Sequence, residues 1–179
     1  MKPARPQPPF NLTSWVAEHR HALKPPVANR QLYPAGDFVV MVVGGPNARA
    51  DYHVDPGAEL FFQLEGTLTL KTMQEGVPVD YAIHAGDMFL LPPFVPHSPQ
   101  RPEGSVGLVV ERRREAGERD GFQWYCPACH AILHEEFFTL ENIETQFPAI
   151  FERFYADLAR RTCRACGTVL ERPDRPEPA

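Results

Sequence analysis

The strongest constraint on the fold is a series of short β-type segments between Phe38 and Arg114. Each segment holds roughly four to eight residues with many Val, Leu, Phe and Thr, which is the composition of a strand. Turn signals such as Asp-Pro-Gly, Glu-Gly and Ala-Gly-Asp separate the segments. The 20 prolines of the chain also favour short strands and turns over long helices. Short strands at regular spacing predict a mainly β fold, a barrel or jelly roll.

Chain length and charge limit the functions to consider. A chain of 179 residues can form one full-sized core and a small additional module. Its formal net charge of −5 gives no reason to expect a nucleic-acid partner. No apolar run approaches the roughly 20 residues that a membrane helix needs, and the N-terminal MKPARPQPPF lacks the apolar segment of a secretory signal. We therefore expect a cytoplasmic protein without a membrane or nucleic-acid partner.

A short helix is expected before the strands. Apolar residues recur at helical spacing in residues 12–23, which predicts an amphipathic helix lying against the barrel. Thr13 or Ser14 could cap this helix, and Pro25-Pro26 should end it.

The composition changes after Glu115, where a charged, glycine-containing linker begins. Beyond the linker, aromatic and aliphatic residues at three- and four-residue steps predict a helix over Pro148–Arg161, with Pro148 in its first turn. We therefore divide the chain into a β-strand domain, residues 1–115, and a small C-terminal module with a tail, residues 116–179. A module of this size rarely folds without a metal or a similar cross-link.

All four cysteines of the chain lie in two CxxC pairs within the C-terminal module. They are Cys126, Cys129, Cys163 and Cys166. Two such pairs predict tetrahedral ligation of Zn or Fe by four thiolates, and a redox disulfide is the weaker alternative. Gly167 would relieve the turn after the second pair. Four sulfur ligands leave no open position on the metal, so the predicted role is structural.

A second candidate metal site lies on the β-type segments. His53 and Glu59 flank an Asp-Pro-Gly turn, and His97 follows about forty residues later in the chain. Two histidines and one carboxylate form the facial ligand set of non-haem Fe(II) oxygenases, which leaves positions open for substrate and O2. The alternative is that these are three unrelated polar residues on a sheet.

Longer motifs support the metal-site interpretation. The first cupin motif, G-x5-H-x-H-x3,4-E-x6-G, is matched except for two extra residues after its first glycine, by Gly45, His53, Asp55, Glu59 and Gly66. The second motif, G-x5-P-x-G-x2-H-x3-N, is matched in part, by Gly86, Pro92 and His97. The chain therefore resembles the cupins. It departs from their pattern with Asp55 at a histidine position, Phe94 at a glycine position and Arg101 at the final asparagine, and we favour Glu59 over Asp55 as the third ligand.

Three further polar residues could act on a substrate. Arg49 precedes His53 by four residues and Arg101 follows His97 by four, so each arginine would share a face with a candidate ligand if the segments stay extended. Two guanidinium groups beside a metal would bind an anionic substrate, although both could equally be surface residues. Glu111 ends a predicted strand, and its pattern leaves open whether it faces the interior or solvent.

A more specific resemblance covers nearly the whole chain, from about Phe10 to Gly167. The segments VVGGPNARADYH, ELFFQLEG, LLPPFVPHSPQRPEGS and GFQWYCPAC with CRACG are similar to those of bacterial 3-hydroxyanthranilate 3,4-dioxygenases. The resemblance implies that His53, Glu59 and His97 bind catalytic Fe(II). It also implies that Arg49, Arg101 and Glu111 hold the substrate's carboxylate and amine, that the four-cysteine site is rubredoxin-like, and that the chain forms a homodimer.

The implied activity is an extradiol-type ring cleavage. The family converts 3-hydroxyanthranilate and O2 to 2-amino-3-carboxymuconate semialdehyde, which closes to quinolinate on the route from tryptophan through kynurenine to NAD. Two alternatives stay open: a cupin dioxygenase for a related aminophenol carboxylate, and a non-catalytic cupin that binds a small acid. Among the other residues, we expect Phe61, Phe62 and Phe89 in the barrel core, and Arg112–Arg114 in a solvated linker.

Overall fold

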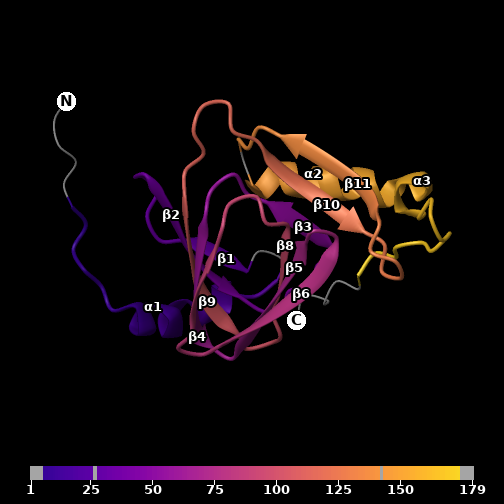
Figure 1. The fold of residues 1–179 in the computed structure, drawn as a ribbon. Coiled ribbons are helices and arrows are strands. Elements are labelled where there is room, and N and C mark those ends of the chain that lie inside the picture. Colours follow the sequence, from indigo (N-terminus) through magenta and orange to yellow (C-terminus); the bar gives the residue numbers. More distant parts are fainter. Residues whose placement is uncertain (1–5, 26–27, 142, 174–179) are drawn as a thin grey trace.

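The computed structural model describes residues 6–25, 28–141 and 143–173, and it contains two antiparallel sheets that face each other (Figure 1). One sheet has the order β1 (Asn29–Gln31), β2 (Phe38–Gly44), β9 (Val106–Arg112), β4 (Glu59–Glu65) and β7 (Met88–Leu91). The other has the order β11 (Ile132–Phe138), β10 (Asp120–Tyr125), β3 (Asp51–Val54), β8 (His97–Gln100), β5 (Thr67–Gln74) and β6 (Val77–His84). The expected mainly β, cupin-type barrel is confirmed.

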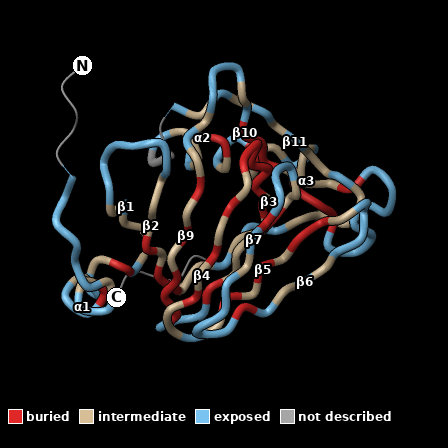
Figure 2. Tube along the Cα trace, turned by 60° about the vertical axis from the view of Figure 1, so that its left-hand side comes forward, coloured by how far each residue is buried: buried red, intermediate tan, exposed pale blue. Residues whose placement is uncertain are grey.

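Side chains alternate between the two faces of each strand, and those on the inner face fill the space between the sheets. Figure 2 shows the buried residues along these strands. In β4, Glu59, Phe61 and Gln63 are buried, whereas the residues between them are half-buried on the opposite face of the strand. Phe61 belongs to the main apolar core, as predicted, and Phe89 is half-buried against that core. Phe62 was predicted in the core, but its parity places it on the outer face of the sheet.

The predicted N-terminal helix is present as α1 (Leu12–His19), followed by a 3-10 turn, η1 (Arg20–Ala22). Val16 and Leu23 pack with Val42 of β2 in a second apolar cluster, so the segment lies against the barrel as expected. The predicted cap was wrong: the side chain of Asn11 accepts a hydrogen bond from the backbone N–H of Ser14 at 2.9 Å. The predicted stop at Pro25-Pro26 lies partly outside the described residues.

The predicted C-terminal helix has different bounds in the structure. It is divided into α2 (Ile143–Ala156) and α3 (Leu158–Arg161), with Pro148 inside α2 instead of in its first turn. The division occurs at Asp157, whose extended backbone ends α2 and whose side chain accepts from the N–H groups of Ala159 and Arg160. Aspartate is a favoured N-cap residue, so a new helix begins there.

The C-terminal part of the chain shares a sheet with the barrel. β10 pairs with β3 on one side and with β11 on the other, and α2 packs on this extension (Figure 1). The packing centres on Phe122, Trp124 and Phe154, and the rings of Trp124 and Phe154 stack with centroids 4.2 Å apart. One sheet therefore runs through both parts, and the division of the chain at residue 115 stays a proposal about folding units.

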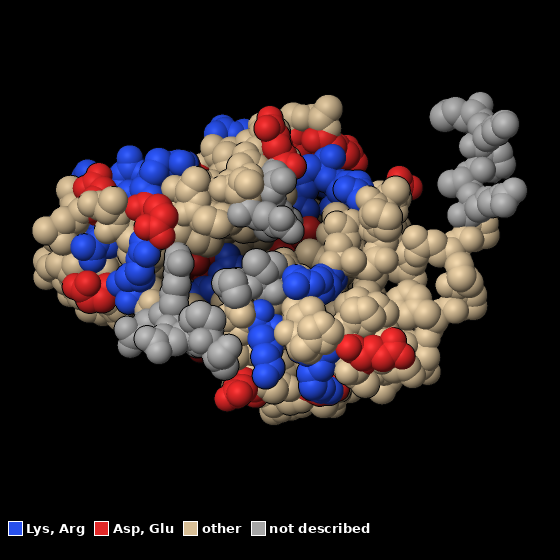
Figure 3. Space-filling view, turned by 180° about the vertical axis from the view of Figure 1, so that it is seen from behind, with Lys and Arg blue, Asp and Glu red and all other residues tan. Residues whose placement is uncertain are grey.

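Charged residues are mixed on the surface of the molecule. On the face shown in Figure 3, acidic and basic side chains are interspersed over the visible surface. The net charge of −5 is therefore not gathered into one acidic patch on this face. Within the described residues, none of the helices has the length and apolar character required to cross a membrane.

Candidate active site

The two sheets bring His53, Glu59 and His97 together inside the barrel. His53 on β3 and His97 on β8 are direct cross-strand partners, and Glu59 begins β4 in the opposite sheet. The Oε1 atom of Glu59 lies 2.9 Å from Nε2 of His97 and 3.7 Å from Nδ1 of His53. All three residues are buried. The structure thus assembles the predicted two-histidine, one-carboxylate set from both sheets.

Hydrogen bonds on the far side of each imidazole orient the two histidines. Nδ1 of His97 lies 3.0 Å from the carbonyl oxygen of Val95, which can only accept a hydrogen bond, so this nitrogen carries the proton. Nε2 of His53 lies 2.8 Å from Oδ2 of Asp120, an arrangement that fits donation by the imidazole N–H. These bonds direct the lone pairs of His97 Nε2 and His53 Nδ1 toward Glu59, as metal ligation requires.

The carboxylate of Glu59 is charged and incompletely satisfied. Burial by itself would raise its pKa, but the neighbouring His97 and His53 hold the pKa of Glu59 at about 2. Within the part of the chain that the structure describes, its buried Oε1 atom makes no hydrogen bond of good geometry. A buried anionic oxygen without a hydrogen bond, beside two imidazole lone pairs, fits a bound divalent metal ion.

Asp55 makes other polar contacts, although its carboxylate lies within 4.8 Å of that of Glu59. Its Oδ1 atom accepts a hydrogen bond from the backbone N–H of Gly57 at 2.6 Å. Its Oδ2 atom forms an ion pair with Nη2 of Arg114 at 2.7 Å. Asp55 therefore stabilises the turn between β3 and β4, and this geometry supports Glu59 as the carboxylate ligand.

Arg101 is buried, with only 4% of its surface exposed. Its Nη1 atom donates to Oε1 of Gln63 at 3.1 Å, and its Nε atom has no hydrogen-bond partner among the described residues. Burial lowers the pKa of Arg101 to about 10. A Cβ atom on Gly107 would lie 2.8 Å from Nη1 of Arg101, so the glycine leaves the space that the guanidinium occupies. A desolvated guanidinium with a free donor is suited to bind an anion.

Arg49 lies near the candidate ligands, but its guanidinium is already paired. It forms an ion pair with Asp51 and lies 5.9 Å from the ring centroids of both Phe122 and Phe151. Burial and the charge of Arg49 both act to lower the pKa of His97, but Glu59 outweighs them, so the pKa of His97 is raised overall. Arg49 is thus close enough to affect the site electrostatically, and Asp51 limits its freedom to move.

Glu111 faces the interior, which settles the question that its position in the sequence left open. It pairs with Glu59 across β9 and β4 and is 5% exposed. Burial and the nearby charge of Glu59 raise the pKa of Glu111 well above its ordinary value. Glu111 can therefore carry a proton at a higher pH than an ordinary glutamate.

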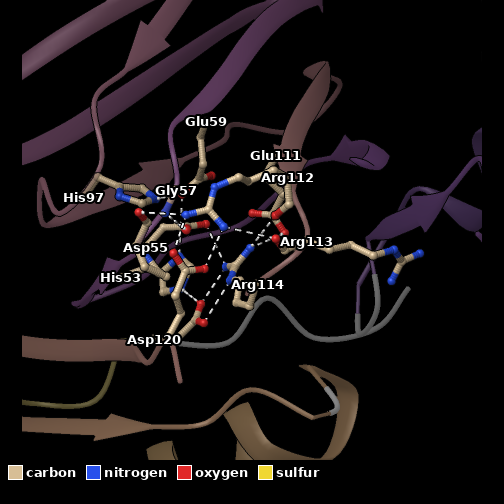
Figure 4. Close-up of polar contacts among 12 residues, drawn as sticks. His53, Asp55, Gly57, Glu59, His97, Glu111, Arg112, Arg113, Arg114 and Asp120 are labelled. Atoms are coloured by element: carbon tan, nitrogen blue, oxygen red, sulfur yellow. Dashed lines mark hydrogen bonds and ion pairs between the residues drawn. The ribbon is translucent and has the colours of Figure 1, made fainter. Parts of the chain in front are cut away.

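The predicted solvated linker at Arg112–Arg114 was wrong for Arg114. The side chain of Arg114 is 11% exposed and lies among the carboxylates of Asp55, Glu111 and Asp120, whereas Arg113 points away from them (Figure 4). Asp120 is fully buried and was not identified from the sequence. Asp120 contacts His53 because β10 pairs with β3, and no local pattern in the charged linker predicts that pairing.

Aromatic rings surround His53 on the side of the C-terminal helix. The ring centroids of Phe122 on β10 and Phe147 on α2 lie 5.5 and 5.8 Å from that of His53. Phe147 directly precedes the helix predicted over Pro148–Arg161, and the sequence did not place it beside the candidate metal site. These rings shield one side of the site from water.

The four cysteines form a second candidate metal centre. Their ligand atoms lie within 4.8 Å of one another; Sγ of Cys126 lies 3.5 Å from that of Cys166, and Sγ of Cys129 lies 3.6 Å from that of Cys163. A tetrahedral site with metal–sulfur bonds of about 2.3 Å requires nearly this sulfur spacing. The cysteines thus gather as a quartet, and Gly167 has the positive φ of 78° expected after the second pair.

The family model described as 3-hydroxyanthranilic acid dioxygenase matches residues 5–155. A protein of Xanthomonas euvesicatoria pv. vesicatoria named 3-hydroxyanthranilate 3,4-dioxygenase is 59% identical over 168 residues, which cover 94% of this chain and 95% of that protein. A protein of Ruegeria pomeroyi with the same name is 47% identical, over 94% of each chain.

Among solved structures, a cupin-2 domain containing protein from Shewanella frigidimarina aligns with 57% of this chain and 100% of its own, with a TM-score of 0.45 and 20% identity. The family model spans most of the sequence, and its range includes the candidate ligands His53, Glu59 and His97 as well as Glu111. The chain belongs to the 3-hydroxyanthranilic acid dioxygenase family.

Proposed function

We propose that the protein is an Fe(II)-dependent dioxygenase that cleaves the ring of 3-hydroxyanthranilate with O2 to give 2-amino-3-carboxymuconate semialdehyde. The relatives named for this reaction cover nearly the whole chain. The observation within the structure that carries the proposal is the buried Oε1 atom of Glu59, which faces two imidazole lone pairs without a hydrogen bond of its own. This activity would serve quinolinate and NAD formation from tryptophan.

We propose His53, Glu59 and His97 as the ligands of the catalytic iron. When bound there, Fe(II) would supply open coordination positions for an aminophenol and O2. The residues of the chain prepare this position, since His97 and His53 are held by Val95 and Asp120 with their lone pairs directed inward. Phe122 and Phe147 exclude water on one side of His53.

Arg101 is the proposed anchor for the substrate carboxylate. Its guanidinium is buried, fixed by Gln63 at one nitrogen, and still has a free Nε–H donor. An incoming carboxylate would supply the negative charge and the hydrogen bond that this site lacks, and would compensate for the desolvation of Arg101. Arg49 would add a second positive charge, which the ion pair with Asp51 partly neutralises.

Glu111 is the proposed group that holds the substrate amine and moves a proton. Its raised pKa makes it a better proton acceptor than an ordinary glutamate. The ion pair between Glu111 Oε1 and Arg114 Nη1, at 3.2 Å, fixes the direction of the carboxyl group. The Glu111 carboxylate would accept a proton from the bound substrate and return it later in the reaction.

Replacing Glu111 tests the proton role. We expect Glu111→Gln to lower kcat by about 100-fold or more, because that is the usual minimum contribution of a positioned acid or base. Steady-state kinetics at equal iron content measures the effect, and Glu103→Gln, at an exposed position, should leave kcat unchanged. Full kcat in Glu111→Gln would remove the proton role and leave only amine binding.

The competing functions are separated by substrate-dependent O2 uptake. Uptake with a related aminophenol carboxylate, but none with 3-hydroxyanthranilate, would favour a cupin dioxygenase of different specificity. Tight binding of the acid without O2 uptake by iron-loaded protein would favour a non-catalytic binding protein. The buried Arg101 is compatible with an acidic ligand in all three cases, so binding alone does not discriminate.

We propose that the four-cysteine site holds Fe or Zn in a structural, rubredoxin-like role. All four positions of a tetrahedral metal would be occupied by Cys126, Cys129, Cys163 and Cys166, so none is left for substrate. Elemental analysis of the purified protein would identify the metal. A site that is empty in folded, fully active protein would contradict the structural role.

We also propose a homodimer formed through the outer face of the five-stranded sheet. Met88 and Leu90 on β7 are 65% and 64% exposed, and β4 presents Leu60 and Phe62 beside them on the same face. A contiguous exposed apolar sheet face is typical of a protein–protein contact. Leu90→Lys should give a monomer in analytical ultracentrifugation, whereas Val77→Lys, at an exposed position on β6, should not; a wild-type monomer would contradict the proposal.

A further inference from the structure

We propose that Arg114 and Asp120 act as a positioning pair that holds His53 in the tautomer and orientation needed to bind the catalytic metal. The inference rests on the proposed metal site at His53, Glu59 and His97, and it adds two residues that touch neither metal nor substrate. They come from the segment after β9 and from the first position of β10.

The first step is the contact between Asp120 and His53. Asp120 Oδ2 lies 2.8 Å from His53 Nε2, on the side of the imidazole away from Glu59. An ionised carboxylate at this point accepts the Nε2–H bond and leaves Nδ1 unprotonated for the metal. Asp120 reaches this position because β10 pairs with β3, with Phe122 opposite His53 in the register.

The second step is the contact between Arg114 and Asp120. Arg114 donates from Nε to Oδ1 at 2.9 Å and from Nη2 to Oδ2 at 2.5 Å, a two-pronged bond that fixes both position and direction of the carboxylate. Asp120 is fully buried, and such a carboxylate is costly to keep ionised without a partner.

The third step concerns the other carboxylates near Arg114. Its guanidinium also pairs with Asp55 and Glu111, and the ligand atoms of Asp55, Glu59 and Glu111 lie within 4.8 Å of one another. Without the positive charge of Arg114, these buried carboxylates would repel Asp120 and displace it. A displaced Asp120 would no longer accept the Nε2–H bond that selects the required tautomer of His53.

Metal binding to three variants tests the pair. We expect Arg114→Gln and Asp120→Asn each to weaken Fe(II) binding at the histidine–glutamate site by about tenfold or more, the usual effect of losing a group that orients a ligand. Arg113→Gln is the matched control: it removes the same charge from a neighbouring arginine whose guanidinium donates to the backbone carbonyls of Gly36 and Pro34. It should bind Fe(II) as the wild type does.

The four-cysteine site must be followed separately. In a titration with Co(II), thiolate ligands give charge-transfer absorption that nitrogen and oxygen ligands do not, so the two sites can be resolved. Retention of the thiolate spectrum also shows that a variant is folded. If Arg114→Gln does not fold, Arg114→Lys, which keeps a charge but loses the two-pronged bond, and Asp120→Asn decide the question.

Two further readouts separate positioning from a general structural effect. Nitrogen NMR of the metal-free protein should show the Nε2–H tautomer of His53 in the wild type and in Arg113→Gln, and a mixture of tautomers in Arg114→Gln. The double variant Arg114→Gln/Asp120→Asn should bind Fe(II) no more than about twofold more weakly than the weaker single variant, because coupled residues are not additive.

The outcomes are distinct. Wild-type affinity and an unchanged His53 tautomer in folded Arg114→Gln and Asp120→Asn would overturn the positioning pair and leave the proposed function intact. Losses of affinity that multiply in the double variant would show that Arg114 does not act through Asp120. A wild-type protein that binds no metal at the histidine–glutamate site would instead overturn the proposed function itself.

Discussion

At the scale of single residues, the functions proposed for Arg101 and Glu59 rest on the polar partner that each of them lacks among the described residues. Each is buried, charged and missing one polar partner, which is the state expected of a site prepared for an anion on one side and a cation on the other. The ligand motif was visible in the sequence because His53 and Glu59 lie six residues apart around a turn. The role of Asp120 was not visible in the sequence, because Asp120 lies 67 positions after His53 and contacts it only when β10 pairs with β3.

Gly107→Ala tests how Arg101 is positioned. The new methyl group would lie 2.7 Å from Gln63 Oε1 and 2.8 Å from Arg101 Nη1, so both side chains must move. We expect KM for the acidic substrate to rise by about tenfold, which corresponds to about 1.4 kcal/mol of lost binding, with unchanged iron content. Steady-state kinetics measures this change, and an unaltered KM would show that Arg101 does not anchor the substrate.

The raised pKa of Glu111 leads us to predict that the stability of the metal-free protein depends on pH. Because its folded-state pKa is raised above 4.5, its contribution to the free energy of unfolding is complete below pH 4.5 and is lost as the pH rises through the folded-state pKa. Wild-type protein should therefore lose more stability between pH 5 and pH 8 than Glu111→Gln. Urea unfolding at the two pH values measures the difference, and parallel losses would contradict the raised pKa.

At the scale of elements, the strands between residues 38 and 112 could be predicted because alternation and turn signals are local. The ends of the helices could not, because side-chain capping decided them. Asn11, and not Thr13 or Ser14, caps α1, so Asn11→Ala should cost about 1 kcal/mol of unfolding free energy. Ser14→Ala should cost less, since only the backbone N–H of Ser14 joins the cap. Equal costs in chemical denaturation would contradict this cap.

The contact of α2 with β10 gives a second prediction at this scale. Phe154 is fully buried and stacks on Trp124, so Phe154→Ala should lower the unfolding free energy by about 3–5 kcal/mol. Leu158→Ala, at a 58% exposed position in α3, should change it by less than about 0.5 kcal/mol. Equal unfolding free energies in the two variants would show that the packing of Phe154 on Trp124 does not stabilise the protein.

At the scale of the whole molecule, the C-terminal part extends the barrel instead of standing apart from it. β10 joins the sheet that carries both histidines, and Phe147 on α2 lies beside His53. The four cysteines connect the end of β10 to the segment after α3. Cys163→Ser should therefore abolish metal binding by thiolates and lower Tm, because structural metal binding contributes to folding. An unchanged Tm in metal-free Cys163→Ser would show that the C-terminal part folds without its metal.

The most direct test of the account is anaerobic reconstitution with Fe(II), followed by addition of O2 and 3-hydroxyanthranilate. We predict formation of the strongly absorbing semialdehyde by the wild-type protein. Product should not form in His53→Ala or Glu59→Ala, while both variants keep the metal of the four-cysteine site. No turnover by folded, iron-loaded wild-type protein would contradict the substrate assignment, and full turnover by either variant would contradict the proposed ligands.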